Sequence, residues 1–111
     1  MTLAESRIQQ EIVMWFRNNY CRVGLVPRCV IFSVPNEGQN EVEQMRKVQT
    51  GLMAGASDLI VIMPNVTIYV ECKDDKGSQS DEQIVFQELV EALGFRYVLV
   101  RSLDDFKSVI L

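Results

Sequence analysis

The hydrophobic pattern begins with a helical repeat. Over residues 3–20 the large apolar side chains recur every three to four positions, which places them on one face of an α-helix. On this face, the aromatic side chains are expected to pack in a core rather than to stack on nucleic-acid bases. The residues concerned are Ile8, Ile12, Trp15 and Phe16.

Two acidic residues of this predicted helix lie near its apolar face. At about 100° per residue, Glu5 falls within the apolar arc, whereas Glu11 sits at its edge. An inward-pointing carboxylate is costly unless it has a partner or a function. Glu5 could also be an ordinary partner of the helix dipole, so the residues alone leave both roles open.

Runs rich in β-branched and aromatic residues predict strands. The first run ends at a turn-forming segment, residues 35–38, and the next two flank a predicted hairpin turn at Pro64 and Asn65. The predicted strands are residues 29–34, 58–63, 67–73 and 95–100.

Three further helices have recognisable caps. Asn40 can cap the first, Ser80 and Gln83 have capping-box spacing at the start of the second, and Ser102 opens the third. Gly94 is the natural stop of the second helix. The helix after Asn40 has a narrow apolar stripe consisting of Val42, Met45 and Val48 or Gln49, with Arg46 and Lys47 outside it.

The resulting order is helix, strand, helix, two-strand hairpin, helix, strand, helix, which predicts an α/β fold with a mixed sheet flanked by helices. A chain of 111 residues has room for one domain, so we expect residues 1–111 to form one. We expect Gly51 and Gly55 to loosen the chain before the hairpin. Leu52 and Met53, which lie between these glycines, have too little periodicity to be fully buried and are therefore the candidates for a dimer surface.

The composition limits the possible chemistry. With no histidine, the chain cannot form a Ser-His-Asp or Cys-His nucleophile or a histidine zinc site. Its cysteines, Cys21, Cys29 and Cys72, fit neither a CxxC metal pair nor an even set of disulfides. We expect Cys72 to be a small core residue. Any reaction must therefore use carboxylates, lysine, hydroxyls or a metal held by oxygen.

The net charge, the length of the apolar runs and the N-terminal sequence indicate what the protein binds and where it is located. A net charge of −4, from 11 basic and 15 acidic residues, argues against coating nucleic acid by charge alone but not against an enzyme that acts on it. The longest aliphatic run, residues 59–63, is far short of the about 20 residues that cross a bilayer, so no membrane partner is expected. With no signal segment visible, we expect the cytoplasm, or the host cytoplasm if the chain is viral.

Two acidic residues and a lysine meet on the predicted hairpin. With the turn as predicted, Asp58 stands opposite Glu71 at about 5 Å between Cβ atoms, and Lys73 follows on the same face. Together with the backbone carbonyl of Cys72, the two carboxylates offer oxygen ligands that suit Mg²⁺ or Mn²⁺. A bound ion could activate water while Lys73 orients or deprotonates it. Alternatively, Asp58 caps a turn and Glu71 is a solvated partner of Lys73.

In these residues the sequence resembles the PD-(D/E)XK phosphodiesterase superfamily, and more closely its virus-type replication-repair nuclease domain, VRR-NUC. That family has a first-helix glutamate, an asparagine–glycine turn, a Gly-small-Asp-Leu segment, an E-X-K strand, a Ser-x-x-Gln helix start and a glycine–aromatic final strand. The matching segments cover almost the whole chain: residues 5–8, 35–38, 55–59, 71–73, 80–83 and 94–97, leading to 101–105.

The resemblance implies a restriction-endonuclease-like core and assigns roles to individual residues. Asp58 and Glu71 correspond to metal ligands, Lys73 to the catalytic lysine, and Gln83 to a helix residue that reaches the same site. The helix-borne acid is Glu5, with Glu11 as the second choice. Ser57 replaces the proline of the superfamily name, which has no chemical role.

The implied activity is that of a Mg²⁺- or Mn²⁺-dependent, structure-specific DNA endonuclease of DNA repair. A homodimer would supply two active sites for the two strands of a branched junction, so a Holliday-junction-resolving enzyme is the favoured version. The alternatives are a flap or restriction-like endonuclease and a catalytically inert nucleic-acid-binding module; the intact acids and lysine count against the latter. Generic candidates for DNA-backbone contacts are Arg17, Arg22, Arg28, Arg46 and Lys47.

Overall fold

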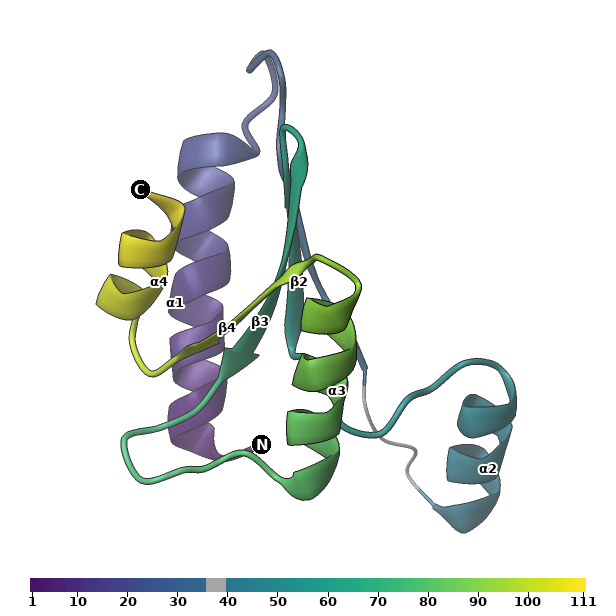
Figure 1. Ribbon diagram of the computed structural model, residues 1–111. Coiled ribbons are helices and arrows are strands. Elements are labelled where there is room, and N and C mark those ends of the chain that lie inside the picture. The colour runs from purple at the N-terminus through teal and green to yellow at the C-terminus, as the bar shows by residue number, and fades with distance from the viewer. Residues whose placement is uncertain (36–39) are drawn as a thin grey trace.

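The hydrophobic core lies between a four-stranded sheet and two helices on one of its faces (Figure 1). The computed structural model describes residues 1–35 and 40–111. The predicted order of elements is confirmed. The elements are α1 (Leu3–Tyr20), β1 (Val30–Ser33), α2 (Glu41–Gln49), β2 (Leu59–Met63), β3 (Val66–Cys72), α3 (Asp81–Ala92), β4 (Arg96–Val100) and α4 (Leu103–Ile110).

The sheet is mixed, as predicted, with the strand order β1-β2-β3-β4. The first three strands are antiparallel neighbours, and β4 runs parallel to β3 after the crossover through α3. In the hairpin, Leu59 pairs with Val70, which is the predicted register. Asn65 in the turn has a φ of 62°, a left-handed conformation that asparagine tolerates better than most residues.

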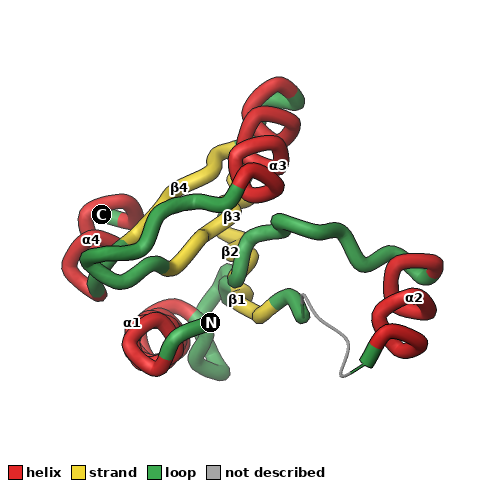
Figure 2. The backbone as a smooth tube through the Cα atoms, turned by 90° about the horizontal axis from the view of Figure 1, so that it is seen from below, coloured by secondary structure: helices red, strands yellow, loops and turns green. Residues whose placement is uncertain are grey.

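Helices α1 and α4 cover one face of the sheet and α3 covers the other (Figure 2). The predicted face of α1 is buried: Ile12 and Phe16 are fully covered, and Phe16 packs edge-on against Phe106 of α4. Trp15 is partly buried and also packs edge-on against Phe106. The interpretation of Trp15 and Phe16 as core residues is therefore confirmed.

The predicted helix caps are present. Oγ of Ser80 accepts a hydrogen bond from the backbone N–H of Gln83, and Oγ of Ser102 accepts one from that of Asp105. A cap that satisfies free N–H groups in the first turn fixes where a helix begins. In the predicted turn 35–38, residues 36–38 lie outside the described part of the chain. No helix of the described residues combines the length and apolarity needed to cross a membrane.

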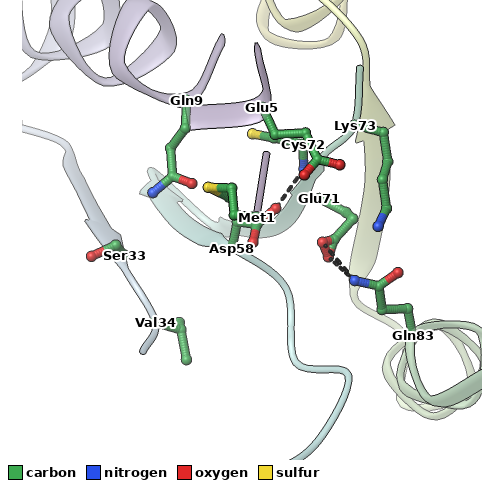
Figure 3. A pocket seen from close by; sticks show the side chains of 10 residues that line it. All are labelled: Met1, Glu5, Gln9, Ser33, Val34, Asp58, Glu71, Cys72, Lys73 and Gln83. Atoms are coloured by element: carbon green, nitrogen blue, oxygen red, sulfur yellow. Dashed lines mark hydrogen bonds between the residues drawn. The ribbon is translucent and has the colours of Figure 1, made fainter. Parts of the chain in front are cut away.

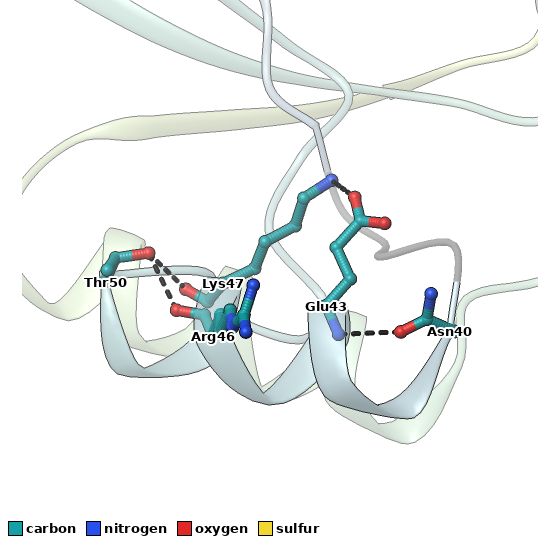
Figure 4. A network of polar contacts seen from close by, with 5 residues as sticks. All are labelled: Asn40, Glu43, Arg46, Lys47 and Thr50. Atoms are coloured by element: carbon teal, nitrogen blue, oxygen red, sulfur yellow. Dashed lines mark hydrogen bonds and ion pairs between the residues drawn. The ribbon is translucent and has the colours of Figure 1, made fainter.

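Helix α2 is set apart from the rest of the molecule in both views (Figures 1 and 2). Two contacts of its described residues are local (Figure 4): Oδ1 of Asn40 accepts a hydrogen bond from the N–H of Glu43, and Lys47 forms a 3.1 Å ion pair with Glu43. Within the described residues, α2 contacts no other helix or strand. The sheet is flanked by helices as predicted, and α2 is the one helix of the described residues that does not pack on it. Its apolar stripe is exposed: Val42 by 60%, Met45 by 62% and Val48 by 54%.

Candidate functional site

The six first-choice site residues line one cavity of about 390 Å³ at the N-terminal end of α1 (Figure 3). They come from α1, from α3, and from the ends of β2 and β3, segments far apart in the sequence. They are Glu5, Asp58, Glu71, Cys72, Lys73 and Gln83, and Met1, Gln9, Ser33 and Val34 complete the lining.

Asp58 directly precedes β2, and its carboxylate is held against β3. Oδ2 accepts a 2.8 Å hydrogen bond from the backbone N–H of Cys72. Since Leu59 pairs with Val70, Asp58 stands one position beyond the last backbone pair of the hairpin, beside Glu71. The register predicted from the turn is thus correct, although β2 begins one residue later than predicted.

Glu71 is buried on the face of the sheet that α3 covers. Strand alternation directs Val70 and Cys72 toward the α1 side and Glu71 toward the other. Its carboxyl oxygens lie 3.3 and 3.4 Å from Nε2 of Gln83, which donates to them. Oε1 of the same Gln83 side chain accepts from the N–H of Ser80 at 2.8 Å. The side chain of Gln83 therefore closes the helix cap and also contacts Glu71.

Burial, and after it the carboxylate of Asp58, raise the pKa of Glu71 to about 9, while the positive charge of Lys73 acts in the opposite direction. Glu71 is only 1% exposed, which excludes the alternative of a solvated strand residue. In the metal-free protein at neutral pH, the pair formed by Asp58 and Glu71 therefore retains a proton. Burial also strongly raises the pKa of the Cys72 thiol, so that this buried core cysteine is a poor nucleophile.

Lys73 follows β3 directly, and its backbone N–H donates to the carbonyl of Val100 at 3.0 Å, extending the pairing with β4. Its side chain is partly buried and extends along the side of the cavity occupied by Glu71 and Gln83 (Figure 3). The backbone hydrogen bond does not depend on the side chain. The ammonium group of Lys73 is therefore available for chemistry, whereas its main chain belongs to the fold.

Arg101 braces the loop after Lys73, a role that sequence reasoning missed. Its Nη1 donates to the carbonyl oxygens of Asp74 at 2.6 Å and Gly77 at 2.7 Å. Oδ1 of Asp74 in turn accepts from the backbone N–H groups of Lys76 and Gly77. Since β3 and β4 are parallel and Cys72 pairs with Val100, the residues that follow these two strands emerge side by side. That register is the signal that could have identified Arg101.

Glu5 is the acid that α1 brings to the cavity. It is buried, and Oε2 accepts a 2.9 Å hydrogen bond from the N–H of Thr2, whose hydroxyl accepts from the N–H of Glu5 in return. Glu5 therefore has a helix-capping role and also lines the site. Its role as a metal ligand remains a prediction. Glu11, the second choice, is exposed and does not line the cavity.

Gly55 fixes the loop before Asp58 instead of loosening it, which corrects our expectation. Its φ is +83°, and a Cβ at this position would overlap the backbone of Glu82 in the first turn of α3. Only glycine allows this close approach without strain. The loop that carries Asp58 is thus packed against the same helix that carries Gln83. Gly51, with a φ of +116° and open space around it, has no such contact.

The donor set fits a small divalent cation. Asp58 and Glu71 are two adjacent carboxyl groups, and after burial the charge of Asp58 is the next largest cause that raises the pKa of Glu71. Carboxylates, a backbone carbonyl and water are the ligands that Mg²⁺ and Mn²⁺ prefer. Among the described residues, no three His, Cys, Asp or Glu side chains are grouped to hold a metal. Further ligands of such an ion would be the Cys72 carbonyl, water and substrate phosphate, with Glu5 as the predicted additional carboxylate.

Comparisons with known proteins identify the fold. A solved structure named "VRR_NUC domain protein" superimposes with a TM-score of 0.74 at 22% identity, over 99% of this chain and 87% of the other. A second, named "VRR_NUC domain", has a TM-score of 0.66 at 22% identity, over 98% of this chain and 96% of the other. No family model and no curated protein matches the sequence. The chain has the α/β fold of the VRR-NUC domain, as its motifs suggested.

Proposed function

We propose that residues 1–111 act as a metal-dependent endonuclease domain that hydrolyses phosphodiester bonds in DNA. The observation that carries the proposal is the cavity in which Asp58, the buried Glu71 and Lys73 come together. The similarity to structures named for the VRR-NUC domain supports the same conclusion. Glu71 is buried beside Asp58, and its pKa is raised by burial and by the Asp58 carboxylate, which is typical of functional sites.

Each residue has a part in the proposed reaction. Asp58 and Glu71, with the Cys72 carbonyl, would hold Mg²⁺ or Mn²⁺, which when bound lowers the pKa of water and neutralises charge on the phosphate. Lys73 orients the attacking water or accepts its proton, and its charge stabilises the developing negative charge at phosphorus. Gln83 keeps the Glu71 carboxylate in place through its amide.

The favoured substrate is a branched DNA such as a four-way junction, cut by a homodimer in DNA repair. Two protomers provide two active sites, one for each strand that has to be cut. A monomer of net charge −4 has little basic surface with which to hold a long duplex alone, so binding two arms through two protomers compensates for weak individual contacts.

Helix α2 provides the candidate dimer surface. An isolated helix of nine residues is only marginally stable in water, and a partner would cover its exposed stripe. In a parallel pair of α2 helices, Val42 and Met45 would form the seam, with Glu41 of one protomer beside Arg46 of the other. Leu52 and Met53, the sequence-based candidates, follow directly and are partly or largely exposed.

The test is cleavage of labelled four-way junction, flap, duplex and single-stranded DNA by the purified protein, with Mg²⁺, Mn²⁺ or EDTA, alongside light scattering. We expect a dimer that cuts the junction in preference to linear duplex. Preference for the flap, or equal cutting of junction and duplex by a monomer, would replace the junction-resolving version by the flap or restriction-like one. DNA binding without cutting in any cation would favour the inert module.

A further inference from the structure

A groove leads from the candidate site along α1 and the edge strand β1. The cavity of the site shares Met1, Gln9 and Ser33 with a second cavity, of about 420 Å³, between these two elements. The second shares Arg17 with a third cavity, of about 600 Å³, which also includes Arg28. The three cavities therefore adjoin one another from the N-terminal turn of α1 to its last turn.

The charge of the groove is opposite to that of the protein. Beyond the site, the described residues that line the second and third cavities include no acidic side chain. Among these described residues, the only charged side chains are those of Arg17 and Arg28, in a chain of net charge −4. Nε of Arg28 donates to the carbonyl of Cys21 at 2.8 Å, which holds this guanidinium beside the third cavity. Within the described chain, neither arginine forms an ion pair with a carboxylate.

The passage from the site into the groove contains an unsatisfied polar group. Oε1 of Gln9 is buried and has no hydrogen-bond partner within the described residues. Its side chain points into the cavity of the site (Figure 3). Buried polar atoms nearly always have a partner, so this amide indicates a missing water or ligand. Since the amide can present either its oxygen or its NH₂ group, it can bind a phosphate oxygen or a water molecule.

We propose that this groove holds the DNA strand that leads away from the cleaved bond, with Arg17 and Arg28 contacting its phosphates. The inference rests on the proposed function and extends it to substrate binding. Arg17 lies about 18 Å along α1 from Glu5, at 1.5 Å per residue. Consecutive phosphates of one strand rise by about 3.4 Å along the duplex axis, so with the duplex parallel to α1, Arg17 contacts the strand about five phosphates from the cleaved bond.

The first test compares two charge-matched double variants by fluorescence anisotropy with labelled junction DNA in Ca²⁺, across a salt series. Arg17→Ala/Arg28→Ala is expected to weaken binding about tenfold and to lower the salt slope of log Kd by about two. The control, Arg7→Ala/Arg96→Ala, removes two exposed arginines outside all three cavities and is expected to bind within about twofold of the wild type. Equal losses in both variants, or none in the first, would overturn the groove assignment.

The second test varies the DNA length beyond the cleavage site. We expect Arg17→Ala to weaken binding when the DNA extends about eight nucleotides beyond the cleaved bond into the groove. With an extension of about two nucleotides, this loss of affinity should vanish. A defect that is independent of this length would overturn the assignment. Binding is measured separately from cleavage. Wild-type protein that binds DNA but cuts it in no cation would therefore refute the proposed hydrolysis and leave the groove assignment standing. Normal cutting with unchanged binding by the Arg17 variant would refute the groove alone.

Discussion

The candidate site and helix α2 differ in how they are held. In the site, the Cys72 N–H holds Asp58, the Gln83 amide holds Glu71, and Arg101 braces the loop after Lys73. These contacts join segments that are far apart in the sequence. The cap and ion pair of α2 join residues within a single turn or two, and the helix contacts no other element of the described chain.

Helices α1 and α2 each have an apolar stripe, but the two stripes have different surroundings. In α1 the stripe is covered by the sheet and α4, and it fixes the position of Glu5 and Gln9 at the cavity. In α2 a similar stripe is exposed, so the helix has to be stabilised from outside or remain marginal. We therefore expect substitutions in the site to alter chemistry or folding, and substitutions in α2 to alter assembly alone.

The largest effect is expected from Lys73→Ala. Loss of the ammonium group should lower the single-turnover rate of DNA cleavage by about 10² or more, because a positioned charge or proton acceptor is removed. Folding should persist because only the Lys73 backbone N–H takes part in the sheet. Lys76→Ala, in the same loop but exposed, is the matched control and should cut normally. Normal cutting by the folded Lys73 variant would remove this residue from the mechanism.

Gly55→Ala tests how tightly the loop of Asp58 is held against α3. The added Cβ would meet the Glu82 backbone at a positive φ, so we expect a loss of about 3 kcal/mol in the free energy of unfolding. Gly51→Ala also has a positive φ but open space, and should cost about 1 kcal/mol. Urea unfolding of both variants gives the comparison. Equal losses of unfolding free energy in the two variants would mean that the close approach of Gly55 to α3 contributes nothing to the cost of Gly55→Ala.

Met45→Lys tests whether α2 serves assembly. Because Met45 is 62% exposed and packs on no other element, the unfolding temperature extrapolated to the monomer should change little. The dimer dissociation constant should rise about tenfold or more, since a charge enters an apolar seam. Analytical ultracentrifugation measures it. Val85→Lys, on the exposed side of α3, is the control, and a similar rise there would argue against α2 as the dimer surface.

Asp58→Asn tests the electrostatics of the metal-free site. The folded protein keeps the Glu71 proton up to about pH 9, whereas the unfolded chain loses it near its ordinary pKa of 4.5. Stability is therefore lost as the pH rises between these values. Removing the Asp58 charge lowers the pKa of Glu71, so the variant should be about 1 kcal/mol more stable than wild type at pH 8 in EDTA. Urea unfolding at pH 5 should show this advantage shrinking, and a constant difference would contradict it.

Much of the fold was predictable because local chemistry determined it. Capping residues such as Ser80 and Ser102 mark where helices begin, and the turn at Asn65 sets the register that brings Asp58 to Glu71. The contacts of Gly55 and Arg101 were not predictable in the same way. They depend on where α3 and β4 pack against distant segments, and sequence spacing carries little information about that.

The sequence predicted that the candidate site residues lie together, but it did not predict the electrostatics of the cavity that they line. The spacing of Asp58, Glu71 and Lys73 indicated a shared face, yet the burial that raises the pKa of Glu71 depends on α3 covering it. The same holds for the choice between Glu5 and Glu11. Both lie near the apolar arc of α1, and only the packing of the helix end brings Glu5 to the cavity.

The most direct measurement of the central claim is single-turnover cleavage of a labelled four-way junction, with wild-type protein and Asp58→Asn in Mg²⁺, Mn²⁺ and excess EDTA. We expect the wild type to cut in either cation and to stop in EDTA, because in the proposed reaction Asp58 and Glu71 would hold the ion that activates water. We expect the variant, with its fold intact, to cut at least about 10² more slowly in both cations. Undiminished cutting in EDTA, or wild-type rates in the variant, would contradict the assignment of this cavity as a metal-dependent nuclease site.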